Sequence, residues 1–311
     1  MHPAFSVILF TTASGAGYGL LAWLGISAPL GLVPADRGFG FTALALALAL
    51  IAGGLLSSMA HLGHPERAWR ALSQWRTSWL SREGVASLAT FLPAGVFGLL
   101  WVGFDRVNGL AGLASAAMAA ATVGCTAMIY VSLKPIRQWA NGWVAPTYGA
   151  LALMTGALWL QVLTQLWAAP RPWLGVVASA AILAGAWLKI CYWRFIDTVH
   201  AASTPETATG LTARKVRFLE APHTEENYLL QEMGYRVARK HSRKLRRIAL
   251  LAGFGLPLVL TWLALLGAGI LSSAAILLAG VLAMAGTLVE RWLFFAEAKH
   301  TVTLYYGAET A

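Results

Sequence analysis

The chain has 311 residues, of which 58% are hydrophobic and only 12% are charged, and this composition excludes an ordinary soluble protein. Globular chains average about 45–50% apolar and about 25% charged residues, because the outside of a soluble domain has to be hydrated. A formal net charge of +10 on a soluble protein would suggest nucleic acid, but here its location has to be found first. We expect an all-α integral membrane protein that has no nucleic acid as a partner.

Apolar runs long enough to cross a bilayer core of about 30 Å occur eight times along the chain. The first run has no Lys or Arg before it and is long enough to span, so we expect a retained helix and not a cleaved signal. The sequence thus predicts a single membrane domain over residues 1–311, built as an eight-transmembrane-helix bundle. The predicted spans are 5–31, 39–60, 84–104, 110–133, 144–167, 173–195, 248–270 and 273–295.

Small residues and tryptophans indicate how these spans are arranged. Gly15 and Gly19 in the first span form a small-xxx-small face that lets helices approach closely. The fourth and fifth spans are rich in Ala and Gly, so we expect them at the centre of the bundle. Tryptophans near span ends are typical of interfacial anchors. Seven residues fit that description: Trp75, Trp79, Trp139, Trp143, Trp167, Trp173 and Trp193.

The positive residues lie mainly on one side of the predicted bundle. Residues 61–83, 134–143, 194–247 and the segment from Arg291 onward carry nineteen of the 23 Lys and Arg residues, while Arg37, Arg106 and Arg171 lie on the opposite side. Loops rich in Lys and Arg stay in the cytoplasm. We therefore expect a multi-pass protein of the bacterial cytoplasmic membrane, with both termini in the cytoplasm.

The long loop over residues 196–247 is the one sizeable hydrophilic segment that the sequence predicts. Apolar residues recur every fourth position from Leu229, and basic side chains occupy much of the remaining surface. A basic amphipathic helix of this kind either rests on anionic headgroups or forms a docking surface for a cytoplasmic partner. The basic residues concerned are Arg236, Arg239, Lys240, Arg243 and Lys244.

Metal centres are not expected in this chain. Cys125 and Cys191 lie far apart in apolar stretches, whereas iron–sulfur clusters and structural zinc sites need four ligands, usually at close spacings. A transmembrane haem would need His pairs on facing helices, but every His falls at or beyond one face of the predicted bundle.

Placing a polar group at membrane depth costs free energy, so each such group marks a candidate site. His61 ends the second span and Glu83 opens the third, so both lie at the same face on consecutive helices. A quinone head group needs a hydrogen-bond donor at a carbonyl and a carboxylate that exchanges protons. The alternative is structural: His61 caps its helix, and Glu83 sits in the first turn of the next, stabilised by the helix dipole.

Three further residues near the same face are open to two interpretations each. Lys189 and Glu290 lie inside the sixth and eighth spans, where they form either a structural ion pair or part of a proton path. Tyr130 ends the fourth span, where it either lines a pocket near the cytoplasm or belongs to the interfacial belt.

Three stretches of the sequence resemble the membrane anchor subunits of dimethyl sulfoxide reductase-type molybdoenzymes. The first is His-Leu-Gly-x-Pro-x-Arg-Ala over residues 61–68, followed by Ser81-x-Glu83; the others are residues 128–139 and 224–234. The last two are most similar to the branch that contains the anchor of the cytoplasmic sulfite-oxidising complex. The resemblance covers the whole chain.

The resemblance implies a non-catalytic subunit that binds a quinone, either ubiquinone or menaquinone. A molybdopterin catalytic subunit would pass electrons through a four-cluster iron–sulfur subunit to this anchor, so those cofactors belong to the partners. The residues expected for quinone binding and proton transfer are His61, Glu83, Arg67, Ser81 and Tyr130. The residues expected for partner docking are His64, Lys134, Arg137, Arg236, Arg239 and Lys240.

The predicted orientation departs from the dimethyl sulfoxide reductase pattern, in which the catalytic subunits lie outside the cytoplasm. Here the loop that contains His61 is expected inside, which favours the sulfite-oxidising branch. Two alternatives remain: an anchor that oxidises quinol to reduce an S- or N-oxide, and a secondary transporter. Transporters tend to have inverted repeats and midplane charges, and the sequence has no convincing repeat between its halves.

Overall fold

The computed structural model describes residues 3–60, 62–198, 203–211, 215–217, 219–220 and 236–306. Within these ranges it confirms the predicted all-helical fold, with eight helical segments long and apolar enough to cross a membrane and with no strand. These segments are α1 (Pro3–Ser27), α2 (Arg37–Met59), α3 with a terminal π-helical turn η2 (Trp79–Gly98, Leu99–Gly103), α4 (Gly109–Val131), α5 (Val144–Leu166), α6 (Pro172–Thr198), α10 continuing through the π-helical turn η3 into α11 (Ser242–Leu250, Leu251–Gly255, Leu256–Leu266), and α12 (Gly269–Ala296).

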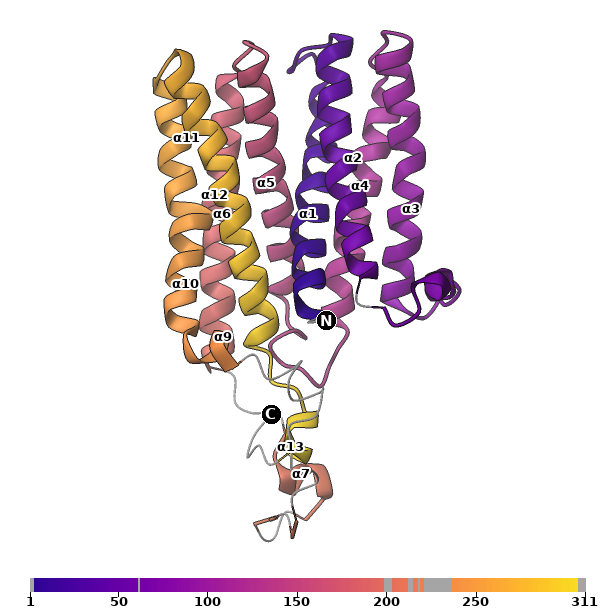
Figure 1. The fold of residues 1–311 in the computed structure, drawn as a ribbon, viewed down its shortest axis with the longest axis vertical. Coiled ribbons are helices and arrows are strands. Elements are labelled where there is room, and N and C mark those ends of the chain that lie inside the picture. The colour runs from indigo at the N-terminus through magenta and orange to yellow at the C-terminus, as the bar shows by residue number, and fades with distance from the viewer. Residues whose placement is uncertain are drawn as a thin grey trace.

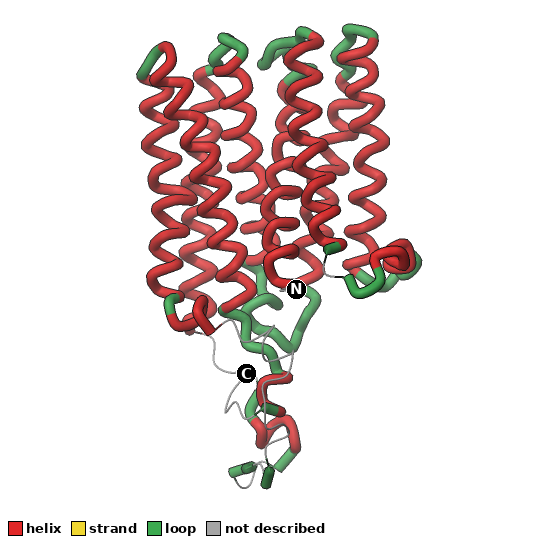
Figure 2. Tube along the Cα trace, in the orientation of Figure 1, coloured by secondary structure: helices red, strands yellow, loops and turns green. Residues whose placement is uncertain are grey.

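The remaining helices are short and lie outside the bundle core. They are the 3₁₀ helix η1 (Pro65–Leu72), α7 (Pro205–Thr209), α9 (Arg236–Lys240) and α13 (Val302–Tyr305). Figures 1 and 2 show the long connections and these short helices at one end of the bundle, together with the start of α1 and the end of α12. Short turns join the helices at the opposite end, so the alternation of loops agrees with the predicted topology.

Side-chain caps at the polar turns define where several spans begin. Asp36, Ser78 and Asn108 precede α2, α3 and α4, and each side chain accepts a hydrogen bond from a backbone N–H in the first turn. Without such acceptors, the first N–H groups of a helix have no intrahelical partner. The polar turns therefore satisfy the helix ends as well as placing them at the membrane boundary.

Helix α1 is the most enclosed span. It packs against α2, α4, α5 and α12, and 78% of its most apolar stretch is buried within the protein. The corresponding share is 67% for α5 but only 44% for α4. The prediction of a central position is thus confirmed for the fifth span. The other central helix is the first span and not the fourth. The polar content of α1, with Thr and Ser among its small residues, suits a helix surrounded by protein.

Glycines allow α1 to touch its neighbours backbone to backbone. A Cβ atom built on Gly19 would lie 1.8 Å from the carbonyl oxygen of Ala152 in α5, and one built on Gly156 would lie 2.2 Å from the carbonyl carbon of Gly19. Gly25 and Gly112 bring α1 and α4 together in the same way. Gly15, in contrast, has no heavy atom within 4 Å of its Cβ position, so the predicted Gly15–Gly19 face is not one contact surface.

Three residues near the end of the bundle differ from their expected roles. Arg291 was counted with the C-terminal segment in the charge balance, but it lies inside α12 and is only 2% exposed. It therefore does not contribute to the loop charge, and eighteen positive residues remain on that side. Trp139 and Trp193 are buried and not interfacial; their indole N–H groups donate to the carbonyl oxygen of Phe294 and to Glu297.

Candidate functional site

Glu83 lies in α3 one turn beyond the first, and its side chain faces the protein interior. Only 6% of the residue is exposed. The hydroxyl of Ser87, one helical turn further on, donates a hydrogen bond of 3.0 Å to its carboxylate. The first turn of α3 contains no acidic residue, which argues against the interpretation that Glu83 serves there to offset the helix dipole. Glu83 is instead a buried carboxylate with a hydroxyl partner.

The segment before α3 covers this carboxylate from the loop side. The Ser81 hydroxyl donates to the carbonyl of Ala71 in η1. A Cβ atom built on Gly84 would lie 2.7 Å from the Leu72 side chain, so these two residues are closely packed. Ser81, expected to bind quinone, therefore fastens η1 onto the start of α3. No residue of η1 is itself buried.

Three other residues of this loop were predicted to bind quinone or a partner subunit. His61, expected to bind the quinone, lies outside the described residues. Arg67 and His64 are exposed, and both contact the carboxylate of Glu66, at 3.7 and 3.0 Å. The structure therefore places Arg67 and His64 on the surface of the loop and groups them around one acid.

Tyr130 is buried in an aromatic cluster near the end of α4. Its ring centroid lies 5.3 Å from those of Trp139 and Phe294, 5.4 Å from Phe295 and 5.9 Å from Tyr148. With 8% exposure it is not an interfacial belt residue. The cluster joins α4, α5 and the end of α12, and Tyr130 is a packing centre within it.

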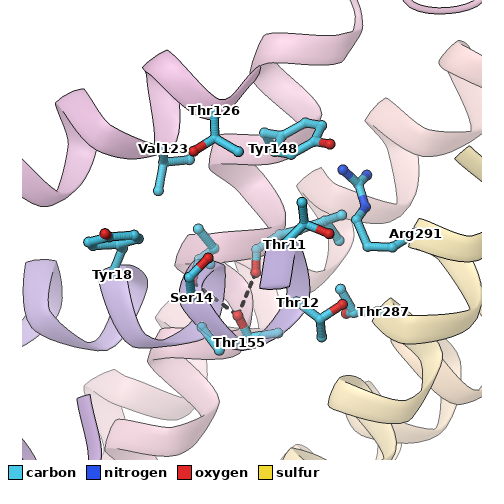
Figure 3. Close-up of a pocket in the computed structure, with 14 residues that line it drawn as sticks. Thr11, Thr12, Ser14, Tyr18, Val123, Thr126, Tyr148, Thr155, Thr287 and Arg291 are labelled. Carbon is cyan, nitrogen blue, oxygen red and sulfur yellow. Dashed lines mark hydrogen bonds between the residues drawn. The ribbon is translucent and has the colours of Figure 1, made fainter. Parts of the chain in front are cut away.

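A narrow polar cavity lies between α1, α4, α5 and α12 (Figure 3). About 20 Å³ is available to the centre of a water molecule, enough for water but too little for a quinone ring as the side chains stand. Eight of the lining residues carry a hydroxyl group. The lining residues are Thr11, Thr12, Ser14, Gly15, Ala16, Tyr18, Val123, Thr126, Tyr148, Leu151, Ala152, Thr155, Thr287 and Arg291.

The two ends of the cavity carry different polar groups. In Figure 3, Tyr18 lies at one end and Arg291 at the other, with Tyr148 beside it. The Tyr18 side chain lies within electrostatic reach of Ser87 and Glu83, although its hydroxyl has no hydrogen-bond partner of good geometry within the protein. The cavity therefore begins next to the candidate carboxylate, a connection that the sequence does not reveal.

A fully buried ion cluster occupies the other end. Glu290 binds both Lys189 of α6 and its neighbour Arg291, whose Nε and Nη2 atoms lie 2.5 and 2.8 Å from the two carboxylate oxygens. The expected Lys189–Glu290 pair is thus confirmed, and Arg291 is an unforeseen third member. The Arg291 guanidinium lies 4.1 Å from the centre of the Tyr148 ring. One carboxylate faces two cations, so the cluster carries an excess positive charge.

A second ion cluster lies just outside the span, at the ends of α6, α10 and α12. Arg246 donates to both oxygens of Asp197 at 2.7 and 2.8 Å, and to Glu297 at 2.7 Å. Burial raises the pKa of the Glu297 carboxyl, and the nearby Arg246 guanidinium opposes that rise. Trp193 links the two clusters, because it donates to Glu297 while its ring lies 5.0 Å from the Lys189 ammonium.

The residues expected for partner docking lie at this same end of the protein. Lys134, Arg137 and Lys240 are exposed, and the side chain of Arg236 lies outside the described part of the structure. Arg239 donates to the backbone carbonyls of Ala296 and Ala298, at 2.7 and 2.9 Å, so it holds α9 against the end of α12. No group of three or more His, Cys, Asp or Glu residues suited to a metal occurs in the described ranges.

Two comparisons with known proteins extend over nearly the whole chain. The family described as DMSO reductase anchor subunit (DmsC) matches residues 1–307. A sulfite dehydrogenase subunit from Allochromatium vinosum is 32% identical over 325 aligned positions, which cover 98% of this chain and 99% of that relative. Both comparisons thus include the buried clusters as well as the loop before α3.

Proposed function

From the membership of this chain in the DMSO reductase anchor subunit family, which its match over residues 1–307 shows, we propose a specific role as the quinone-site subunit of a molybdenum enzyme. In this role the chain is not catalytic on its own. It holds a four-cluster iron–sulfur subunit and a molybdopterin subunit at the membrane, and those partners supply the redox cofactors.

The proposed direction of electron flow is from sulfite to quinone. It is supported by the full-length similarity to a protein named as a subunit of sulfite dehydrogenase and by the positive charge on the loop side of the bundle. That charge predicts a cytoplasmic position for the loops and both termini, in a bacterial inner membrane. The exposed Lys134, Arg137 and Lys240, with His64, Arg236 and Arg239, then face the docked partners.

The proposed quinone site is formed by His61 and Glu83, and the buried state of Glu83 beside Ser87 is the observation that carries it. Reduction of a quinone takes two electrons and two protons. The electrons come from the iron–sulfur partner, and His61 donates a hydrogen bond to one carbonyl oxygen. Glu83 delivers the two protons one after the other and is reprotonated between them. Arg67 and Tyr130 support the site from the loop and from the aromatic cluster, and Ser81 fixes η1 against α3.

Replacement of Glu83 by Gln in the assembled complex tests this role. A general acid contributes about 10²–10⁴-fold to rate, so we expect quinone reduction to fall by at least about 100-fold. Oxidation of substrate with an artificial acceptor that bypasses the anchor should stay at the wild-type rate, which shows that the complex has assembled. The matched control is Asp105→Asn, which changes an exposed acid in the turn before α4, at the opposite end of the bundle. Wild-type quinone turnover in Glu83→Gln would refute the proposed site.

Orientation can be tested separately. A reporter that is active only in the cytoplasm, fused after α12, should be active, and a fusion in the turn between α1 and α2 should be inactive. The reverse pattern would place the loops outside and would favour the alternative role, in which the anchor oxidises quinol to reduce an S- or N-oxide.

A further inference from the structure

We propose that the cavity between α1, α4, α5 and α12 holds water and supplies protons to Glu83 through Tyr18 and Ser87. This inference rests on the proposed function, because it concerns how Glu83 is reprotonated after it has given a proton to a quinone. It adds Tyr18 as a proton-relay residue and assigns water as the ligand of the cavity. Three features support the proposal: the polar residues that line the cavity, the connection of the cavity to Glu83, and the packing of η1 over Glu83, which blocks direct access of protons from the loop side.

The lining requires water. Four residues that line the cavity each have a buried polar atom with no hydrogen-bond partner of good geometry within the protein: Thr12 Oγ1, Tyr18 Oη, Tyr148 Oη and Arg291 Nη1. All four residues are at most 7% exposed. A buried polar atom without a partner costs about 1–3 kcal/mol, and ordered water is the usual partner in such places. The available volume is sufficient for water and, in the side-chain arrangement described, excludes a larger ligand.

The connection to Glu83 runs through two hydroxyl groups. Tyr18 lines the cavity and lies close to Ser87, and the Ser87 hydroxyl donates to the Glu83 carboxylate at 3.0 Å. A hydroxyl both donates and accepts, so it can release one proton while receiving another. When Glu83 has given its proton to the quinone, the carboxylate takes the Ser87 proton, Ser87 takes the Tyr18 proton, and Tyr18 takes one from cavity water. One proton leaves the cavity water for each proton that reaches the quinone.

The direct route from the loop side is covered. Glu83 is only 6% exposed, the Ser81 hydroxyl fastens η1 onto the start of α3, and Leu72 packs against Gly84. In the proposed complex the partner subunits cover the same face. A route through the interior therefore remains open when the surface around η1 is occupied.

Arg291 lines the far end of the cavity and belongs to the buried ion cluster with Glu290 and Lys189. The Arg291 guanidinium keeps its protons, so it orients the water and does not transfer protons itself. Its partner Glu290 also binds Lys189, and Lys189 contacts the ring of Trp193, which donates to Glu297 outside the span. Lys189 can lose and regain a proton, which places the refilling step between the cavity and the cluster of Glu297, Arg246 and Asp197.

Tyr18→Phe is the first test, with Tyr192→Phe as its matched control. Both tyrosines are 1% exposed with an unpartnered hydroxyl, but only Tyr18 lines the cavity. In the assembled complex, Tyr18→Phe should lower the kcat of quinone reduction at least tenfold and leave the KM for quinone unchanged. The solvent deuterium isotope effect should rise above the wild-type value. Tyr192→Phe should show wild-type values for all three.

Gly15→Leu is the second test, because it fills the cavity without removing a proton-carrying group. Gly15 lines the cavity and its Cβ position has open space around it. The variant should reduce kcat as Tyr18→Phe does, while oxidation of substrate with the artificial acceptor stays unchanged. Gly53→Leu, at an exposed and equally open position of α2, is the control.

The outcomes separate this inference from the proposed function. If Glu83→Gln abolishes quinone turnover but Tyr18→Phe leaves kcat and the isotope effect at wild-type values, the cavity route is wrong and the quinone site stands. If Glu83→Gln has no effect, the proposed site itself fails. If Gly15→Leu does not assemble, Tyr18→Phe still decides the question.

Discussion

The backbone contact between α1 and α5 predicts opposite results for two alanine substitutions four residues apart in one helix. Gly19→Ala places a methyl carbon 1.8 Å from the Ala152 carbonyl oxygen, whereas Gly15→Ala places one in open space. The first variant forces the two helices apart along their closest approach, and Gly156 loses its contact with Gly19 at the same time. The second variant displaces nothing.

The expected magnitudes follow from these distances. Real Cβ atoms essentially never approach a neighbour within 3.0 Å, so α1 and α5 must separate by more than 1 Å at Gly19. Overpacking costs about 1–3 kcal/mol and occasionally more, and a clash with backbone belongs at the upper end of that range. Ala gains at most about 1 kcal/mol over Gly in helix propensity. The net loss at Gly19 is about 2 kcal/mol, and Gly15→Ala should be neutral or slightly stabilising.

Thermal unfolding of the purified protein in detergent measures both variants. A loss of about 2 kcal/mol lowers the Tm by on the order of 5 °C in a protein of this size. We expect that decrease for Gly19→Ala and a Tm at or above the wild-type value for Gly15→Ala. Equal Tm values for the two variants would refute the assigned contact, as would a larger decrease for Gly15→Ala.

Two further predictions concern the end of the bundle. Glu290→Gln leaves Lys189 and Arg291 buried without a counter-charge, which should cost about 3–5 kcal/mol of stability. Lys189→Met leaves Glu290 and Arg291 as a pair without net charge and should cost much less. Equal Tm decreases for these two variants would contradict the assigned charges. Burial and a nearby guanidinium lower the pKa of His300, so its protonation in acid favours the unfolded state. Stability should therefore fall as pH drops below about 6.5, and the pH dependence of Tm should be weaker in His300→Gln; an unchanged profile would exclude this contribution.

Much of the fold could be predicted because a membrane span is a local property of the sequence. A run of about 20 apolar residues identifies a helix, and the predicted eight spans agree with the eight long apolar helices of the structure. Some helices begin before the predicted apolar span. The seventh span was predicted from residue 248, but α10 begins at Ser242, because its first turns are helical although they are rich in basic residues. The Lys189–Glu290 pair could also be predicted, since isolated buried charges need partners.

The arrangement of the helices could not be predicted in the same way, because it depends on contacts between distant residues. Nothing local distinguishes Gly15 from Gly19, yet one faces open space and the other a backbone carbonyl. Trp139 and Trp193 have the positions of interfacial anchors but bury their indole rings against the end of α12. Tyr18 could not be identified because its neighbour Ser87 comes from a different helix. For the candidate site itself, the burial of Glu83 is a structural observation, and the quinone roles remain predictions.

The central position of α1 also has a consequence for biogenesis. Ribosomes deliver α1 to the bilayer first, but its neighbours α4, α5 and α12 are synthesised later, and α12 is the last of the long helices. Until α4 is made, the Thr, Ser and Gly residues of α1 have only lipid and α2 beside them, and the side that contacts α12 stays uncovered until the last long helix is in place. The segment that enters the membrane first is thus the last to be fully enclosed, and a nascent chain that stops before α12 leaves that polar surface exposed to lipid.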